Sequence, residues 1–158
     1  MHYFEDIRVG VASEIGSHTF IEEEMIRFAE KYDRQDYHLD PERAKAGPFG
    51  GLIASGWHTS AVFMRLFVHY LRETAEDLRQ AGKPTARLGP SPGFEELKWP
   101  RPVHAGDTVT YRTAVASKRE LKSRPGWGIV RFQNEGFNQK GELVFSFYGK
   151  TLVERKPA

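Results

Sequence analysis

The chain has 158 residues, of which 39% are hydrophobic and 13% aromatic, so we expect one globular domain over residues 1–158 with its own core. It contains no cysteine, which excludes disulfide frameworks, thiolate metal sites and cysteine nucleophiles. The 23 basic residues nearly balance the 21 acidic ones, and the net charge of +2 argues against nucleic acid as a main partner.

Nothing in the sequence predicts secretion or a membrane span. The first residues lack a basic segment followed by an apolar run, so we expect no signal peptide. The longest apolar stretch, 61–71, is interrupted by Arg65 and His69 and is shorter than the roughly 20 residues that a membrane helix needs. We therefore expect a cytoplasmic protein that does not contact membranes.

Two helices are predicted in the first third of the chain. In residues 22–32 the apolar side chains recur every three to four positions, as on one face of a helix, and glutamates fill the first turn. Residues 41–46 follow Asp40, which suits the N-cap position, and begin with Pro41, which is favoured at the first helical position.

A longer helix is predicted from Gly56 to about Arg79. It carries two apolar stripes over its first part and becomes polar after Leu71. A helix that is apolar around most of its circumference is normally buried, so we expect this one to occupy the centre of the core. The two stripes consist of Trp57, Ala61, Met64, Val68 and Leu71, and of Val62, Phe63, Leu66, Phe67 and Tyr70.

The remainder of the chain has the pattern of β-strands. Alternating apolar and polar residues predict strands at 94–99, 107–121, 129–137 and 143–155, with a further strand between positions 12 and 20. The stretch 138–141 has the composition of a hairpin turn. Together these elements predict an α+β fold in which a mainly antiparallel sheet wraps around the long buried helix.

The residues suited to catalysis cluster between Asp33 and Gly56. Asp33 stands at the expected end of the first helix, His38 follows five residues later, and Leu-Asp-Pro at 39–41 comes next. The glycine-containing loop 49–56 then leads into the long helix. In this order and spacing the segment resembles the MaoC-like dehydratase family, which includes the R-specific enoyl-CoA hydratases and has the hot-dog fold. The resemblance extends to the later stretches 94–99, 102–107 and 143–147.

This resemblance implies a hydratase or dehydratase that reversibly adds water to a trans-2-enoyl thioester of the acyl-CoA type. Asp33 and His38 would hold one water between them and share the transfer of its protons. The backbone N–H of Gly56, at the start of the long helix, is the candidate for stabilising negative charge on the thioester oxygen. The resemblance also implies at least a homodimer, and no cofactor beyond the carrier of the substrate.

Five further residues are candidates for binding the substrate. Gly51 and Ser55 lie in the glycine-containing loop, and Ser60 lies on the long helix. Lys122 and Arg124 belong to a short basic stretch that is suited to an anionic group such as a phosphate of CoA. No metal site is expected, because the sequence has neither an HExxH motif nor clustered metal-ligand spacing.

Some positions depart from the family pattern, and they keep other functions open. Gln35-Asp36 stands where these hydratases have Asn-Pro, and Asp36 adds a charge that can shift the pKa values of the dyad. Met64 stands where some of them have a serine. A hot-dog thioesterase is one alternative, although no carboxylate lies between positions 56 and 71. A non-catalytic acyl-binding subunit is the other.

Overall fold

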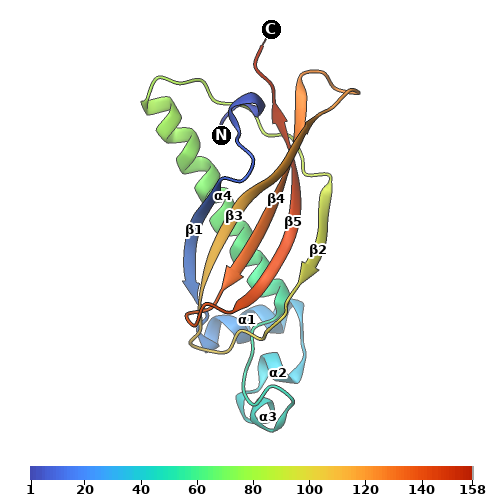
Figure 1. The fold of residues 1–158 in the computed structure, drawn as a ribbon. Helices are drawn as coiled ribbons and strands as arrows, with labels where there is room; N and C mark the ends of the chain where they lie inside the picture. Colours follow the sequence, from blue (N-terminus) through green and yellow to red (C-terminus); the bar gives the residue numbers. More distant parts are fainter. Residues whose placement is uncertain (158) are drawn as a thin grey trace.

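Five antiparallel strands form one sheet in the order β1-β3-β4-β5-β2 (Figure 1). The computed structural model describes residues 1–157. All five predicted strands are confirmed, with ends shifted by one or two residues. They are β1 (Ala12–Thr19), β2 (Gly93–Lys98), β3 (Thr108–Glu120), β4 (Trp127–Phe137) and β5 (Leu143–Glu154).

The turn between β4 and β5 shows why the chain reverses at this point. The side-chain oxygen of Asn138 accepts hydrogen bonds from the N–H groups of Lys140 and Glu142, at 3.0 and 2.9 Å. Gly141 has a φ of +76°, a left-handed conformation that glycine adopts without strain. The hairpin turn predicted at 138–141 is therefore confirmed.

Four α-helices and one short 3-10 helix complete the fold. The predicted helices are confirmed, and Asp40 caps the third one by accepting hydrogen bonds from the N–H groups of Glu42 and Arg43. The two shortest helices, of three and four residues, have no counterpart among the predicted elements, because so few residues cannot show a helical period. The elements are η1 (Phe4–Asp6), α1 (Glu22–Tyr32), α2 (Asp36–Leu39), α3 (Pro41–Ala46) and α4 (Gly56–Gln80).

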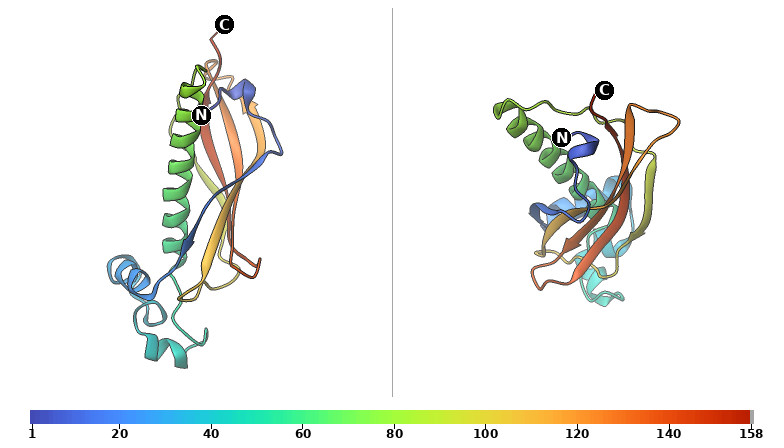
Figure 2. Two further views of the ribbon diagram at one scale, coloured as in Figure 1. Left: turned by 90° about the vertical axis from the view of Figure 1, so that its left-hand side faces the viewer. Right: turned by 45° about the horizontal axis from the view of Figure 1, so that its top comes forward.

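Helix α4 runs along one face of the sheet, as the edge-on view shows (Figure 2). Phe63 on α4 and Phe145 on β5 are 1% and 0% exposed, and their ring centroids lie 5.5 Å apart. Burying an aromatic side chain of this size stabilises the fold by about 1.5–3 kcal/mol relative to leaving it in water. The core predicted between the sheet and the long helix is thus confirmed.

One apolar stripe of α4 faces away from the sheet, contrary to the expectation that the helix would be buried all round. Trp57, Met64 and Val68 are 53%, 50% and 39% exposed. The physical reason is that a single sheet covers only one side of a helix. Within this chain, α4 therefore presents an uncovered apolar face.

The short helices and the chain termini lie at opposite ends of the sheet. Helices α1, α2 and α3 gather at the end where α4 begins, while the N-terminus, the C-terminal end and the β3–β4 turn lie at the other end (Figure 1). Across residues 1–157, no helix is long and apolar enough to cross a membrane.

Candidate functional site

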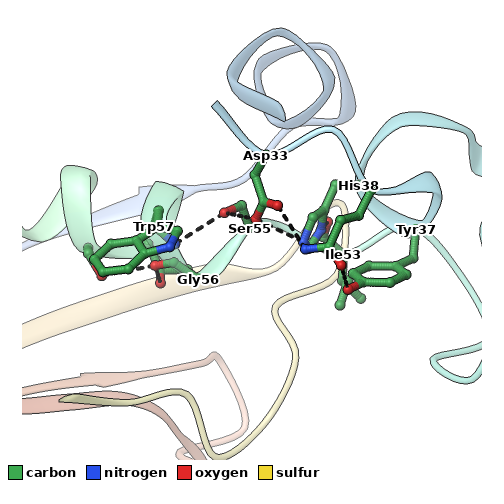
Figure 3. Close-up of polar contacts among 10 residues, drawn as sticks. Asp33, Tyr37, His38, Ile53, Ser55, Gly56 and Trp57 are labelled. Atoms are coloured by element: carbon green, nitrogen blue, oxygen red, sulfur yellow. Dashed lines mark hydrogen bonds and ion pairs between the residues drawn. The ribbon is translucent and has the colours of Figure 1, made fainter. Parts of the chain in front are cut away.

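Asp33 lies directly after α1, where the chain leaves the helical conformation. Its backbone N–H still donates to the carbonyl of Ala29, but its own φ and ψ of −155° and 72° end the helix. This turn directs the Asp33 carboxylate toward the start of α4 (Figure 3). There it accepts hydrogen bonds from the side chains of Gln35, at 2.8 Å, and Ser55, at 2.7 Å.

His38 lies on α2 and is only 5% exposed. Its Nδ1 is 2.8 Å from the carbonyl oxygen of Ile53. A carbonyl oxygen can only accept, so Nδ1 carries the hydrogen and donates it. This bond turns Nε2 toward Oδ2 of Asp33, at 3.3 Å (Figure 3). The structure therefore brings the predicted Asp33 and His38 together, with Nε2 of His38 facing the carboxylate.

A second set of hydrogen bonds orients the Asp33 carboxylate from the solvent side. The hydroxyl of Tyr37 donates to the side-chain oxygen of Gln35, and the amide nitrogen of Gln35 then donates to Oδ1 of Asp33. Tyr37 thus orients the side chain of Gln35, and Gln35 orients the carboxylate of Asp33. The sequence did not reveal this relay, because it depends on the local turn between α1 and α2.

These hydrogen bonds stabilise the charged form of Asp33. Partial burial alone would raise the pKa of its carboxyl group. The hydrogen bonds from Gln35 and Ser55, together with the nearby imidazole of His38, outweigh burial and leave the pKa of Asp33 below its ordinary value. Asp36, expected to influence the dyad, instead pairs with Arg43 at 3.3 Å on the protein surface. Asp33 is therefore held as a carboxylate at neutral pH.

Gly56 is the first residue of α4 and lies next to this pair. The hydroxyl oxygen of Ser55 caps the helix by accepting a hydrogen bond from the N–H of Trp57, at 3.2 Å. Among residues 1–157, the N–H of Gly56 has no acceptor. A side chain at Gly56 would meet the indole ring of Trp99 at 2.5 Å, so this position requires glycine.

His38 and Gly56 line one cavity of about 260 Å³. Thr59, Val103 and Val144 form part of its buried wall. Exposed side chains from the glycine-containing loop and the β2–β3 connection surround the opening: Phe49, Trp99, Pro100, Arg101 and Pro102. No local pattern indicates that Trp99 and Arg101 lie here, because their position depends on packing between segments distant in the chain.

The remaining predicted binding residues fall in different places. Gly51 lies near His104 rather than on the cavity wall, and the hydroxyl of Ser60 donates to the carbonyl of Gly56, at 2.9 Å. Lys122 and Arg124 are exposed in the β3–β4 turn, at the opposite end of the sheet (Figure 1). Within this chain they do not contact the dyad, and Arg101 is the cation that lies beside the cavity.

The candidate site lies within the part of the chain that is similar to known proteins. The model of the MaoC like domain family matches residues 8–131, which include Asp33, His38 and Gly56. This protein belongs to the MaoC-like domain family. A 3-hydroxyacyl-thioester dehydratase Z of Mycobacterium tuberculosis is 33% identical over 104 residues, which cover 65% of this chain and 62% of that protein.

Solved structures agree with this assignment. The MaoC-like dehydratase from Rhodospirillum rubrum superposes with a TM-score of 0.82 and 37% identity, over 100% of both chains. A Mycobacterium tuberculosis protein with a double hot-dog fold superposes with a TM-score of 0.77 and 19% identity, over 99% of this chain and 45% of that chain. At that identity the likeness concerns the fold alone, and it confirms the hot-dog fold predicted from the sequence.

Proposed function

We propose that this MaoC-like protein is a hydratase/dehydratase that reversibly adds water to a trans-2-enoyl thioester and forms a 3-hydroxyacyl thioester. The observation that carries the proposal is the contact between the Asp33 carboxylate and Nε2 of His38, because His38 lines a cavity together with Gly56 at the start of α4. Membership of the family and the similarity to a 3-hydroxyacyl-thioester dehydratase support the same reaction class.

In the proposed reaction, Asp33 and His38 bind one water molecule between them. Nε2 of His38 accepts a proton while the water oxygen attacks the β-carbon of the substrate. The carboxylate of Asp33 orients the water, and it stabilises the imidazolium that forms at His38. That proton then moves to the α-carbon, so the whole water molecule is added across the double bond.

The N–H of Gly56 stabilises the charge that develops on the thioester oxygen during the attack. Since this N–H is at the first residue of α4, it points out of the helix at the positive end of the helix dipole. A donor fixed in advance at such a place stabilises an oxyanion without reorganisation. The absence of a side chain at Gly56 leaves room for the indole ring of Trp99, which packs against the start of α4 beside this N–H.

The substrate carrier, the oligomeric state and the cellular compartment belong to the same proposal. The substrate arrives on CoA or an acyl carrier, and no further cofactor takes part. Arg101 beside the cavity is suited to the anionic groups of such a carrier. The exposed apolar face of α4 supports a homodimer, because a soluble monomer rarely leaves large apolar side chains together in water. We expect this assembly to act in the cytoplasm.

The reaction class is tested by two simultaneous measurements on the purified protein. Trans-2-enoyl-CoA substrates of several chain lengths lose absorbance at the conjugated thioester when water adds, and a thiol reagent detects any free CoA. Loss of absorbance without thiol release supports the hydratase. Thiol release would instead identify a thioesterase. If neither signal appears but calorimetric titration shows that the enoyl-CoA binds, the protein is a non-catalytic acyl-binding protein.

A further inference from the structure

The cavity beside the dyad extends only a short way along α4. Its volume of about 260 Å³ is below the roughly 300–1,000 Å³ that is typical of small-molecule sites. Beyond Gly56, Thr59 is the single α4 residue on its wall. Thr59 is 2% exposed, and its carbonyl accepts a hydrogen bond from the hydroxyl of Tyr111, at 3.0 Å. This hydrogen bond connects α4 to β3 at the level of Thr59.

One helical turn farther along, aromatic rings fill the space between α4 and the sheet. Phe63 follows Thr59 by four residues and so faces the same way. Its ring centroid lies 5.5 Å from that of Phe145, 5.0 Å from Phe147 and 6.1 Å from Tyr111. Phe63, Phe145 and Tyr111 are at most 1% exposed. These four residues are called the aromatic wall below.

A second, larger cavity lies beyond the aromatic wall. Its volume is about 690 Å³, and Phe67, Tyr70, Thr113 and Phe132 contribute to its lining. Phe67 follows Phe63 by another four residues and stacks on it, with centroids 5.5 Å apart. Thr59 and Phe67 are eight positions apart, which corresponds to about 12 Å along the helix axis. The two cavities thus lie along the same side of α4, separated by the wall.

We propose that Phe63 is a specificity-determining residue that closes the inner end of the acyl site and restricts this protein to short-chain enoyl thioesters. The inference rests on the proposed function and adds the substrate class to it. An acyl chain bound with its thioester at Gly56 extends inward past Thr59 and meets the ring of Phe63. Close-packed aromatic rings do not yield to added methylene groups without a large cost in packing.

The wild-type protein gives the first test. Crotonyl-CoA should be hydrated with a kcat/KM at least about tenfold higher than trans-2-octenoyl-CoA, because the longer chain has no room. Calorimetric titration should likewise show that butyryl-CoA binds and that octanoyl-CoA binds more weakly. Equal hydration of both enoyl chains would overturn the role of Phe63 but keep the proposed function. No hydration of any chain would overturn both.

Variants of the aromatic wall give the second test. Phe63→Leu and Phe145→Leu open the space toward the larger cavity, so the preference should shift toward trans-2-octenoyl-CoA by about tenfold or more. The matched control is Phe20→Leu, which shortens an equally buried phenylalanine packed on His18 and His58, outside the wall. It should leave the chain-length preference unchanged. A folded Phe63→Leu protein that keeps the wild-type preference, or an equal shift in Phe20→Leu, would overturn the inference.

Discussion

The hydroxyl of Ser55 donates a hydrogen bond to Oδ2 of Asp33, at 2.7 Å, and so connects the N-cap of α4 to the residue that ends α1. The same oxygen atom accepts the N–H of Trp57. One small side chain therefore fixes both the start of the long helix and the position of the carboxylate. The geometry of the dyad and the geometry of the Gly56 N–H are coupled through this residue.

Replacing Ser55 should affect activity more than stability. Ser55→Ala removes a hydrogen bond to a charged group, so we expect kcat/KM for crotonyl-CoA to fall roughly tenfold to a hundredfold. Loss of the N-cap should lower the free energy of unfolding by about 1 kcal/mol. Ser55→Thr keeps a hydroxyl group, so its kcat/KM and its free energy of unfolding should lie between those of Ser55→Ala and the wild type. Ser60→Ala, whose hydroxyl bonds to the Gly56 carbonyl, serves as the control and should keep most activity.

Gln35 should control the pH range over which the site works. Gln35→Leu removes the donor to Oδ1 of Asp33, which is one of the contributions that lower the pKa of this carboxyl group, so the pKa of Asp33 should rise. A higher pKa means that Asp33 takes up a proton at a higher pH, and the acidic limb of the kcat/KM profile should move upward. On that limb we expect kcat/KM of the variant to be roughly tenfold below the wild-type value, and at neutral pH we expect a smaller decrease.

The control for this experiment is Gln80→Leu. Gln80 also donates to a carboxylate, that of Glu76, but it lies at the far end of α4. Its pH–rate profile should match that of the wild type. If both variants moved the acidic limb by the same amount, the hydrogen bond between Gln35 and Asp33 would not be the cause.

His58 should make the fold sensitive to acid. Burial, with smaller contributions from His18 and Arg65, lowers the pKa of His58 from 6.5 to about 4 despite the nearby Glu24. The unfolded chain therefore binds a proton between pH 6.5 and about 4 that the folded protein does not bind. The free energy of unfolding should fall as the pH decreases through this interval.

The variant that tests this effect is His58→Phe. The ring of His58 stacks on Phe28 at 4.6 Å, and a phenylalanine keeps this contact without titrating. Urea unfolding at several pH values should show that the variant loses less stability than the wild type between pH 6.5 and 4, by on the order of 2 kcal/mol. Parallel losses in both proteins would contradict the role of His58.

The exposed face of α4 should hold two chains together. A glutamate at Met64 or Val68 would have to be buried without a partner in the interface, so Met64→Glu with Val68→Glu should weaken the dimer at least about tenfold. Analytical ultracentrifugation should give twice the 18.1 kDa of one chain for the wild type and one chain for the variant. Val9→Glu, which changes an equally exposed apolar residue away from α4, should stay dimeric.

Elements with a strong period could be predicted from the sequence. Helix α1 has the predicted bounds, because its apolar residues mark one face and the glutamates mark its start. The resemblance of segment 33–56 to the MaoC-like family pointed to Asp33 and His38, and the fold does bring this pair together. These features depend on residues close in the chain, and local sequence therefore determines them.

Other features depend on contacts that no local pattern encodes. The bonds from Gln35 and from the Ile53 carbonyl follow from the shapes of two turns, and the approach of Trp99 to Gly56 joins segments about forty positions apart. The two apolar stripes of α4 look alike in sequence, although Trp57, Met64 and Val68 of one stripe remain exposed. The charge of Lys122 and Arg124 suits an anionic ligand, but charge does not indicate the end of the sheet at which the β3–β4 turn lies (Figure 1).

The most direct test of the proposed reaction compares two neighbouring aspartates. Asp33→Asn keeps the size of the side chain but removes the carboxylate that contacts His38, whereas Asp36→Asn removes an exposed one that pairs with Arg43. With crotonyl-CoA followed by absorbance, kcat/KM of Asp33→Asn should fall at least about a hundredfold, while Asp36→Asn should stay near the wild-type value. An Asp33→Asn protein as active as the wild type would contradict the assignment of the dyad.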